Sequence, residues 1–122
     1  MRIRIRWKDR EIVGVVNETP TAKAVYAALP VSAKASTWGD EVYFDLPVET
    51  ELAPDARPVV DPGTICYWVQ GGALALPFGP TPISQGNECR LISAVNVLGT
   101  LEGDPALLGT IRDGNTITLE AV

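Results

Sequence analysis

The stretch TICYWVQGGALALPF, residues 64–78, decides the fold. Two apolar segments, TICYWV (64–69) and ALALPF (73–78), flank a Gln-Gly-Gly sequence at 70–72, which is typical of a β-hairpin turn. A strand with one face in water alternates apolar and polar residues, whereas nearly every residue of these two segments is apolar. We therefore predict two central strands whose faces are both covered by other parts of the chain.

Strands with one solvent-exposed face are predicted before and after this hairpin in the sequence. RIRIRW (2–7) alternates strictly between arginines and apolar residues, and EIVGVV (11–16) follows a short polar break, so the two segments predict a second hairpin. Further extended segments are predicted at 31–37, 41–46, 59–60, 89–99 and 115–122, with an irregularity near 93–96. The side chains expected in the interior include Ile3, Ile5, Phe44, Ile117 and Leu119.

Helical signals occur in two places. Thr19 supplies a capping hydroxyl and Pro20 suits the first helical position, which predicts a main helix over about 20–29 that ends before Pro30. A Gly-Asp-Pro sequence at 103–105 starts a short helix over about 104–109.

These elements predict a mainly β fold with one domain over residues 1–122. Short strands without regular βα alternation argue against a parallel sheet. About eight mostly antiparallel strands with one or two helices fit a closed barrel whose ends are plugged by the helices. The 46% hydrophobic and 20% charged content is that of a globular chain.

Composition also excludes several classes of partner. A net charge of −5 argues against nucleic acid, since phosphate binding needs a basic surface. No apolar run approaches the ~18 residues that span a membrane, and the charged N-terminus lacks the apolar stretch of a signal peptide. A cytoplasmic location and no membrane partner are therefore expected. Cys66 and Cys89 stand without any His, so we expect two small buried thiols rather than a zinc site.

The charges are unevenly distributed along the chain. Half of the ten basic residues lie in the first hairpin: Arg2, Arg4, Arg6, Lys8 and Arg10. Seven of the fifteen acidic residues lie between positions 40 and 61. Attraction between these segments, within one chain or between two copies in a homo-oligomer, is one hypothesis, and an ordinary solvated strand face is the other.

The stretch TWGDEVYFDLP (37–47) places two adjacent carboxylates beside aromatic residues. Alternation puts Asp40 in a turn and Glu41 at the first outward, solvated position of a strand that also carries Asp45. Asp40 and Glu41 then point to opposite sides, so we expect no metal site.

Four segments carry a family resemblance over nearly the whole chain. TWGDEVYF (37–44), GTICYW (63–68), ALPFGPTPIS (75–84) and SAVNVLG (93–99), in this order and spacing, resemble the small cyclophilin-like proteins of bacteria and archaea. The resemblance implies a cyclophilin-like barrel of about eight strands, in agreement with the strand pattern. It implies no established biochemical activity.

Cyclophilins proper are prolyl isomerases, so this activity is the first enzyme hypothesis. Their site combines an Arg with Phe, Gln, Trp and His, whereas this chain has no His, and its Gln-Gly-Gly sequence lacks the preceding Arg and Phe. A degenerate isomerase site would have to use Arg90 with Phe78 or Trp68. The absence of His also excludes Ser-His-Asp and Cys-His nucleophiles, and no glycine-rich loop precedes a helix. We therefore assign no catalytic residue and no cofactor.

A ligand-binding pocket is the remaining hypothesis, because aromatic residues near strand ends occur together with a few polar ones. The candidate pocket residues are Trp38, Tyr43, Trp68, Phe78, Thr81, Ser84, Arg90 and Asn96. Alternatively, the aromatic residues fill the core and Asn96 satisfies backbone groups at a bulge. The leading functional hypothesis is a non-catalytic module that binds a small molecule or a proline-containing peptide. The alternatives are a prolyl isomerase with a degenerate site and an assembly protein.

Overall fold

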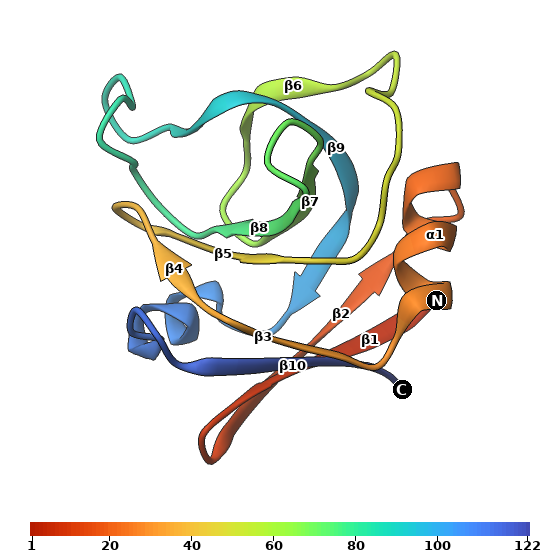
Figure 1. Ribbon diagram of the computed structural model, residues 1–122. Coiled ribbons are helices and arrows are strands. Elements are labelled where there is room, and N and C mark those ends of the chain that lie inside the picture. The colour runs from red at the N-terminus through yellow and green to blue at the C-terminus, as the bar shows by residue number, and fades with distance from the viewer.

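The computed structural model describes residues 1–122 and contains ten strands, one α-helix and one 3₁₀ helix (Figure 1). In chain order the elements are β1 (Arg2–Trp7), β2 (Arg10–Val16), α1 (Pro20–Ala28), β3 (Val31–Lys34), β4 (Ser36–Thr37), β5 (Glu41–Asp45), β6 (Arg57–Val60), β7 (Thr64–Trp68), β8 (Ala73–Pro77), β9 (Cys89–Glu102), η1 (Pro105–Thr110) and β10 (Thr116–Ala121). Both predicted hairpins are confirmed.

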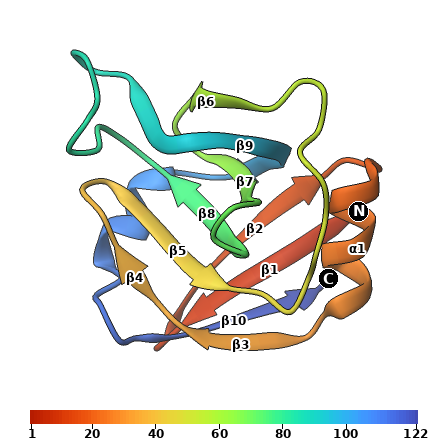
Figure 2. The ribbon, with the colours of Figure 1, turned by 45° about the horizontal axis from the view of Figure 1, so that its top comes forward.

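Antiparallel ladders join the strands in the order β3-β10-β1-β2-β9-β7-β8-β5-β4, and β6 pairs separately with β9. The two edge strands, β3 and β4, follow each other in the chain, so the sheet curls until its edges meet at Ala35 (Figure 2). No ladder joins these edges, because β3 pairs with β10 while β4 pairs with β5. The prediction of a closed barrel of about eight strands is therefore wrong in two respects: the hydrogen-bonded sheet is open, and it has ten strands.

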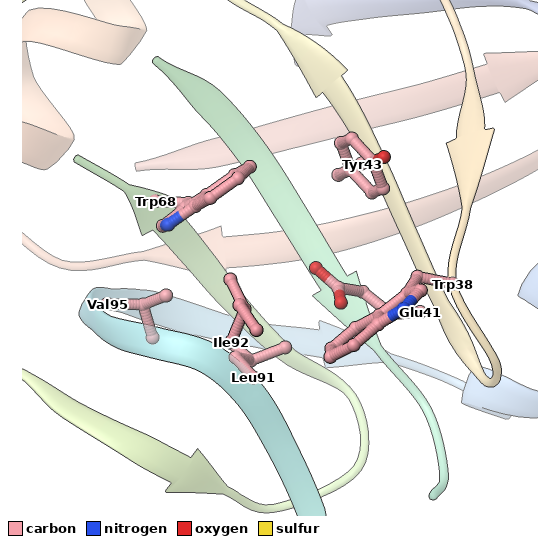
Figure 3. Close-up of a pocket in the computed structure, with 7 residues that line it drawn as sticks. All are labelled: Trp38, Glu41, Tyr43, Trp68, Leu91, Ile92 and Val95. Carbon is pink, nitrogen blue, oxygen red and sulfur yellow. The ribbon is translucent and has the colours of Figure 1, made fainter. Parts of the chain in front are cut away.

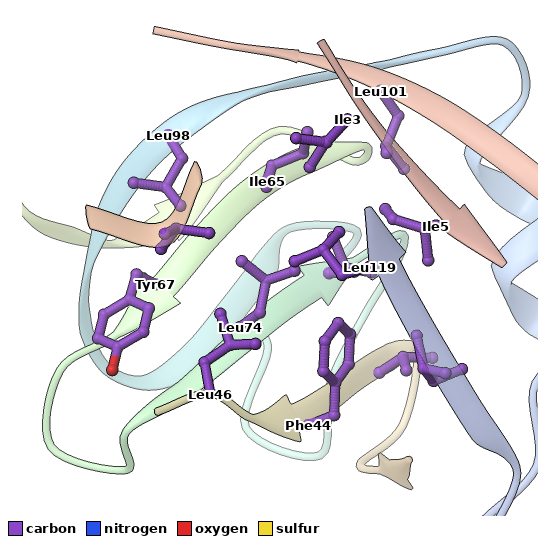
Figure 4. Packing of buried hydrophobic residues seen from close by; sticks show 14 of the residues in the cluster. Ile3, Ile5, Phe44, Leu46, Ile65, Tyr67, Leu74, Leu98, Leu101 and Leu119 are labelled. Atoms are coloured by element: carbon purple, nitrogen blue, oxygen red, sulfur yellow. The ribbon is translucent and has the colours of Figure 1, made fainter. Parts of the chain in front are cut away.

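The main core lies inside this curled sheet. Ile3, Ile5, Phe44, Ile117 and Leu119 are each at most 1% exposed, which confirms their predicted burial. Figure 4 shows the labelled members of this group among other apolar side chains directed toward one another. Each such side chain contributes about 1.5–3 kcal/mol by leaving water.

A second, smaller apolar cluster covers the outer side of β7 and β8. Ile65 and Leu74 of these strands face the main core, whereas Cys66 and Ala75 belong to the smaller cluster. The other buried members of this cluster are Val60, Cys89, Leu91 and Val95, from β6 and the first half of β9. The predicted burial of both faces of the central hairpin is thus confirmed.

β9 provides this cover because it takes part in two layers. Its first half pairs with β6, and its second half pairs with β7 and β2 (Figure 2). Register shifts accompany both ladders on the β7 and β6 sides. An extra residue in one strand bends that strand, so these irregularities let β9 pass from the sheet to the covering layer.

The helices lie at opposite ends of the curled sheet (Figure 1). The Thr19 hydroxyl accepts a hydrogen bond from the Ala22 amide at 3.3 Å, and the helix ends at Ala28, within one residue of the prediction. The second helix is a 3₁₀ helix over Pro105–Thr110, close to the predicted 104–109, and its Leu108 is fully buried. Neither helix has the length and apolar character needed to cross a membrane.

The arginine face of β1 is paired with acidic residues of neighbouring strands. Arg2 binds Glu102 at 3.1 Å, Arg4 binds Glu11 at 2.8 Å, and Arg6 binds Glu120 at 3.4 Å. None of these partners lies in the acidic segment 40–61, so the hypothesis of attraction to that segment within the chain is wrong. The sheet order explains the difference, because β10 and β2 flank β1 and supply Glu120 and Glu11, and β9, which follows β2, supplies Glu102.

Candidate functional site

A cavity of about 230 Å³ lies between β5, the end of β7 and the first half of β9. Its lining residues are Trp38, Glu41, Tyr43, Trp68, Leu91, Ile92 and Val95 (Figure 3). Six of these seven residues are hydrophobic, and Glu41 is the one charged group.

The cavity forms because β5 has two covered faces. Val42 and Phe44 point into the main core, so Glu41 and Tyr43 point to the opposite side, beneath the layer formed by β9. The exposed Ile92, at 57% relative accessibility, lies on the outer part of the cavity wall.

The aromatic wall is held in a defined geometry. The rings of Tyr43 and Trp68 meet edge to face, with centroids 6.1 Å apart and planes at 87°. Such a pair contributes about 0.5–1.5 kcal/mol beyond the area that it buries. The Trp68 indole also donates a hydrogen bond to the Ser93 hydroxyl at 2.8 Å. Because the Trp68 ring packs against Tyr43 and its indole nitrogen is hydrogen-bonded to Ser93, its position is defined before any ligand binds.

Glu41 is the unusual member of the set. Only 6% of the residue is exposed, and its carboxylate takes part in none of the ion pairs of the structure. The carboxylate oxygens are not among the fully enclosed atoms that lack a partner, so they are open to the cavity that Glu41 lines. Burial raises the pKa of this carboxyl from 4.5 to about 7, because the charged form is the one that loses most by leaving water. Figure 3 shows the carboxylate directed into the space between Trp38 and Trp68.

The expectation of a solvated Glu41 is therefore wrong, although its predicted side of β5 is right. The outer face of the strand is roofed by β9, which arrives from a distant part of the sequence. Asp40 is exposed in the preceding turn, as predicted. Its amide donates a hydrogen bond to the Pro80 carbonyl at 3.0 Å.

Both cysteines lie close to this region as buried, unpaired thiols, which confirms that part of the prediction. Burial raises the pKa of Cys66, and the nearby Glu41 charge raises it further. Burial also raises the pKa of Cys89. The two thiols therefore stay neutral and supply no charge to the cavity.

The structure brings together three of the predicted pocket residues, Trp38, Tyr43 and Trp68. Phe78 lines a different hollow, where its ring approaches Gly109. Because Phe78 and Trp68 do not share a cavity, and Arg90 lines neither of their cavities, the three side chains of the isomerase hypothesis are not assembled into one site.

Thr81, Ser84 and Arg90 hold the loop before β9 together. The Ser84 hydroxyl accepts hydrogen bonds from the amides of Thr81 at 2.8 Å and Arg90 at 3.2 Å, and the Thr81 hydroxyl donates to the Arg90 carbonyl. The Arg90 guanidinium is bound to Glu88 at 2.7 Å. The polar groups of these residues are thus engaged within the loop.

Asn96 connects β9 to the segment that follows β5. Its side-chain oxygen accepts a hydrogen bond from the Ala53 amide at 2.7 Å, and its nitrogen donates to the Glu51 carbonyl at 2.9 Å and the Thr21 hydroxyl at 3.0 Å. The residue is only 2% exposed. This arrangement matches the alternative in which Asn96 satisfies backbone groups.

The sequence prediction missed Glu41, Leu91, Ile92 and Val95 as cavity residues. A usable signal was present in the central hairpin, because strands that are apolar on both faces require a covering layer. β5 pairs with β8, so the same layer extends over Glu41 and Tyr43. No group of three His, Cys, Asp or Glu side chains is placed to hold a metal ion.

Comparisons with known proteins agree with this architecture. A family model described as Cyclophilin-like matches residues 1–120. The solution structure of a hypothetical protein from Archaeoglobus fulgidus is 37% identical, with a TM-score of 0.85, and the match covers 100% of this chain and 95% of that one. No curated protein matches the sequence. The chain therefore belongs to the cyclophilin-like family.

Proposed function

We propose that this protein is a binding module for a small, largely apolar molecule that enters the cavity beside Glu41. The observation that carries the proposal is the buried carboxylate without a partner, at the edge of an aromatic wall. Burying an unpaired charge costs free energy, and an apolar residue at this position would avoid that cost. Groups with strongly perturbed pKa values in apolar cavities are frequently functional.

The size of the cavity supports a small ligand. Benzene occupies an engineered cavity of about 150 Å³, so by proportion a cavity of about 230 Å³ accommodates a molecule of about nine non-hydrogen atoms. The ring-edge contact and the indole hydrogen bond of Trp68 leave little side-chain freedom to be lost on binding. A wall that is already ordered favours affinity.

Tryptophan indole signals offer a direct test. The full chain is titrated with benzyl alcohol, benzylamine, benzoate and N-acetylproline amide, and the indole N–H resonances are followed by NMR. Trp38 and Trp68 line the cavity, whereas Trp7 is buried elsewhere, with its indole bound to Thr110 at 3.0 Å. We expect at least one probe to shift the signals of Trp38 and Trp68 but not of Trp7. Unchanged Trp38 and Trp68 signals with every probe would refute the proposal.

A matched pair of variants locates the site. Ile92→Ser removes apolar surface from the cavity wall, and Ile83→Ser makes the same change at an exposed isoleucine outside it. Losing about 1 kcal/mol of apolar contact weakens binding about fivefold. We expect this loss for Ile92→Ser only. Equal affinities of the two variants would place the ligand elsewhere.

A further inference from the structure

We infer that the ligand of this cavity carries an organic cation, an ammonium group that pairs with Glu41 and lies against the rings of Trp38, Tyr43 and Trp68. This inference rests on the proposed function, since it names the chemical class of the molecule bound at the same site. Three observations support it, and they concern charge, ring chemistry and size.

The first observation is that the chain supplies no cation to Glu41. The ion pairs of the structure join other residues, and Arg90, on the strand that roofs the cavity, is bound to Glu88. Burial is the cause of the raised pKa of Glu41, with no cationic side chain acting against it. An ammonium group from a ligand would complete the pair, and it would add a hydrogen bond to a charged acceptor.

The second observation is the aromatic surroundings of this carboxylate. Indole and phenol rings attract cations electrostatically, and tryptophan does so most strongly. Two tryptophans and a tyrosine share the cavity with one acidic group. An anionic ligand would meet repulsion from Glu41, whereas a neutral ligand would leave the electrostatic preference of the rings unused.

The third observation is the division of the cavity into a charged part and an apolar part. Leu91, Ile92 and Val95 line it from the β9 side, opposite β5, which carries Glu41 (Figure 3). A molecule of about nine non-hydrogen atoms can place its ammonium group at Glu41 and its apolar remainder on these residues. Small aryl or cyclic amines have this division.

Protons and the cation should compete for Glu41. The other titratable or charged groups on its own strand and on the segments packed around it are Asp40, Tyr43, Asp61, Cys66, Cys89, Arg57 and the paired Glu88 and Arg90. The thiols remain neutral, because burial raises the pKa of Cys66 and of Cys89. With a pKa of about 7, Glu41 is the group that changes charge near neutral pH. Cation affinity should therefore fall about tenfold per pH unit well below pH 7 and level off above it.

The test compares probes of matched size on the full chain. Benzylamine, benzyl alcohol and benzoate are titrated at pH 8 by NMR, and benzylamine, whose ammonium group stays charged over this range, is also titrated between pH 5.5 and 8.5. We expect benzylamine to bind at least tenfold more tightly than benzyl alcohol, and benzoate to bind least. Glu41→Gln should weaken benzylamine at least tenfold and change benzyl alcohol by less than threefold.

The outcomes separate the two proposals. Benzyl alcohol or benzoate binding as tightly as benzylamine would overturn the cation assignment and leave the binding function standing. A pH-independent affinity for benzylamine in the unmodified protein would also overturn it, whether or not the Glu41→Gln variant folds. The absence of binding by every probe would remove the proposed function itself.

Discussion

Replacing Glu41 by glutamine is expected to stabilise the unliganded protein at pH 8 and to have little effect near pH 4.5. The pKa of this carboxyl is 4.5 when freely hydrated and about 7 in the folded protein. At about 1.4 kcal/mol per pKa unit, this difference corresponds to about 3 kcal/mol of folding free energy.

The direction follows from the raised pKa. Below about pH 4.5 the group is neutral in both states, so the folded protein has its full stability. As the pH rises from 4.5 through about 7, the unfolded chain ionises first, and the free energy of unfolding falls by about 3 kcal/mol. Glutamine stays neutral throughout, so the variant lacks this decline. The advantage of Glu41→Gln should therefore appear between pH 4.5 and 7 and remain constant above that range.

The assay is urea denaturation followed by far-ultraviolet circular dichroism from pH 4.5 to 8.5. Subtracting the two pH profiles cancels other carboxyls, including Glu88, whose pKa is lowered mainly by its hydrogen bond with Arg90. Asp45→Asn is the matched control, because Asp45 is an exposed carboxylate on the same strand, and its effect should stay within about 0.5 kcal/mol. A difference between Glu41→Gln and the unmodified protein that is the same at pH 4.5 and pH 8 would contradict the buried, unpaired state of Glu41.

Two further predictions concern the second half of β9, which ties the strand that roofs the cavity to the main sheet. Asn96→Ala removes the partner of the Ala53 amide and of the Glu51 carbonyl. We expect the free energy of unfolding in urea to fall by about 2–4 kcal/mol and hydrogen exchange at the Ala53 amide to become faster. Unchanged exchange at Ala53 would contradict the anchoring role of Asn96. Gly99→Ala would drive a methyl group into the Val15 carbonyl oxygen, and backbone cannot move aside as a flexible side chain can. We therefore expect a loss of about 3 kcal/mol or more in the free energy of unfolding, and a variant as stable as the original protein would contradict the close approach of β2 and β9.

Much of the fold was predictable because the hydrophobic period of a strand and the capping of a helix depend only on residues that are close in the sequence. The alternation of 2–7 indicates the side of each residue, and the uniformly apolar central hairpin indicates that both of its faces are covered, without reference to distant partners. Thr19 and Pro20 likewise determine the start of α1 through their own hydrogen-bonding groups. These features required no knowledge of what lies across the sheet, and the structure confirms them.

Closure of the sheet was not predictable in the same way. Residues 31–37 have the extended pattern of one strand, but their pairing is divided at Ala35 between β10 and β5. Which strand accepts each half depends on the three-dimensional curl of the sheet. A periodic pattern contains no information on this, so the predicted barrel was more complete than the observed one.

The candidate site required the same kind of distant information. Trp38, Tyr43 and Trp68 were predicted because aromatic residues at strand ends are visible in sequence, but Glu41 was assigned to solvent because alternation gives the side of a strand and not what covers it. The cover comes from β9, about 50 residues later, and it reaches β5 only because β9 bends between two layers.

A structural role for Glu41 would need a partner within the fold, and the structure provides none. Asn96, also buried and polar, makes three hydrogen bonds that explain its position by stability alone. Glu41 makes none with its side chain, and its ionisation costs about 3 kcal/mol, so packing alone would favour an apolar residue at this position. The contrast between these two buried polar residues assigns Asn96 to the fold and leaves Glu41 to be explained by what enters the cavity.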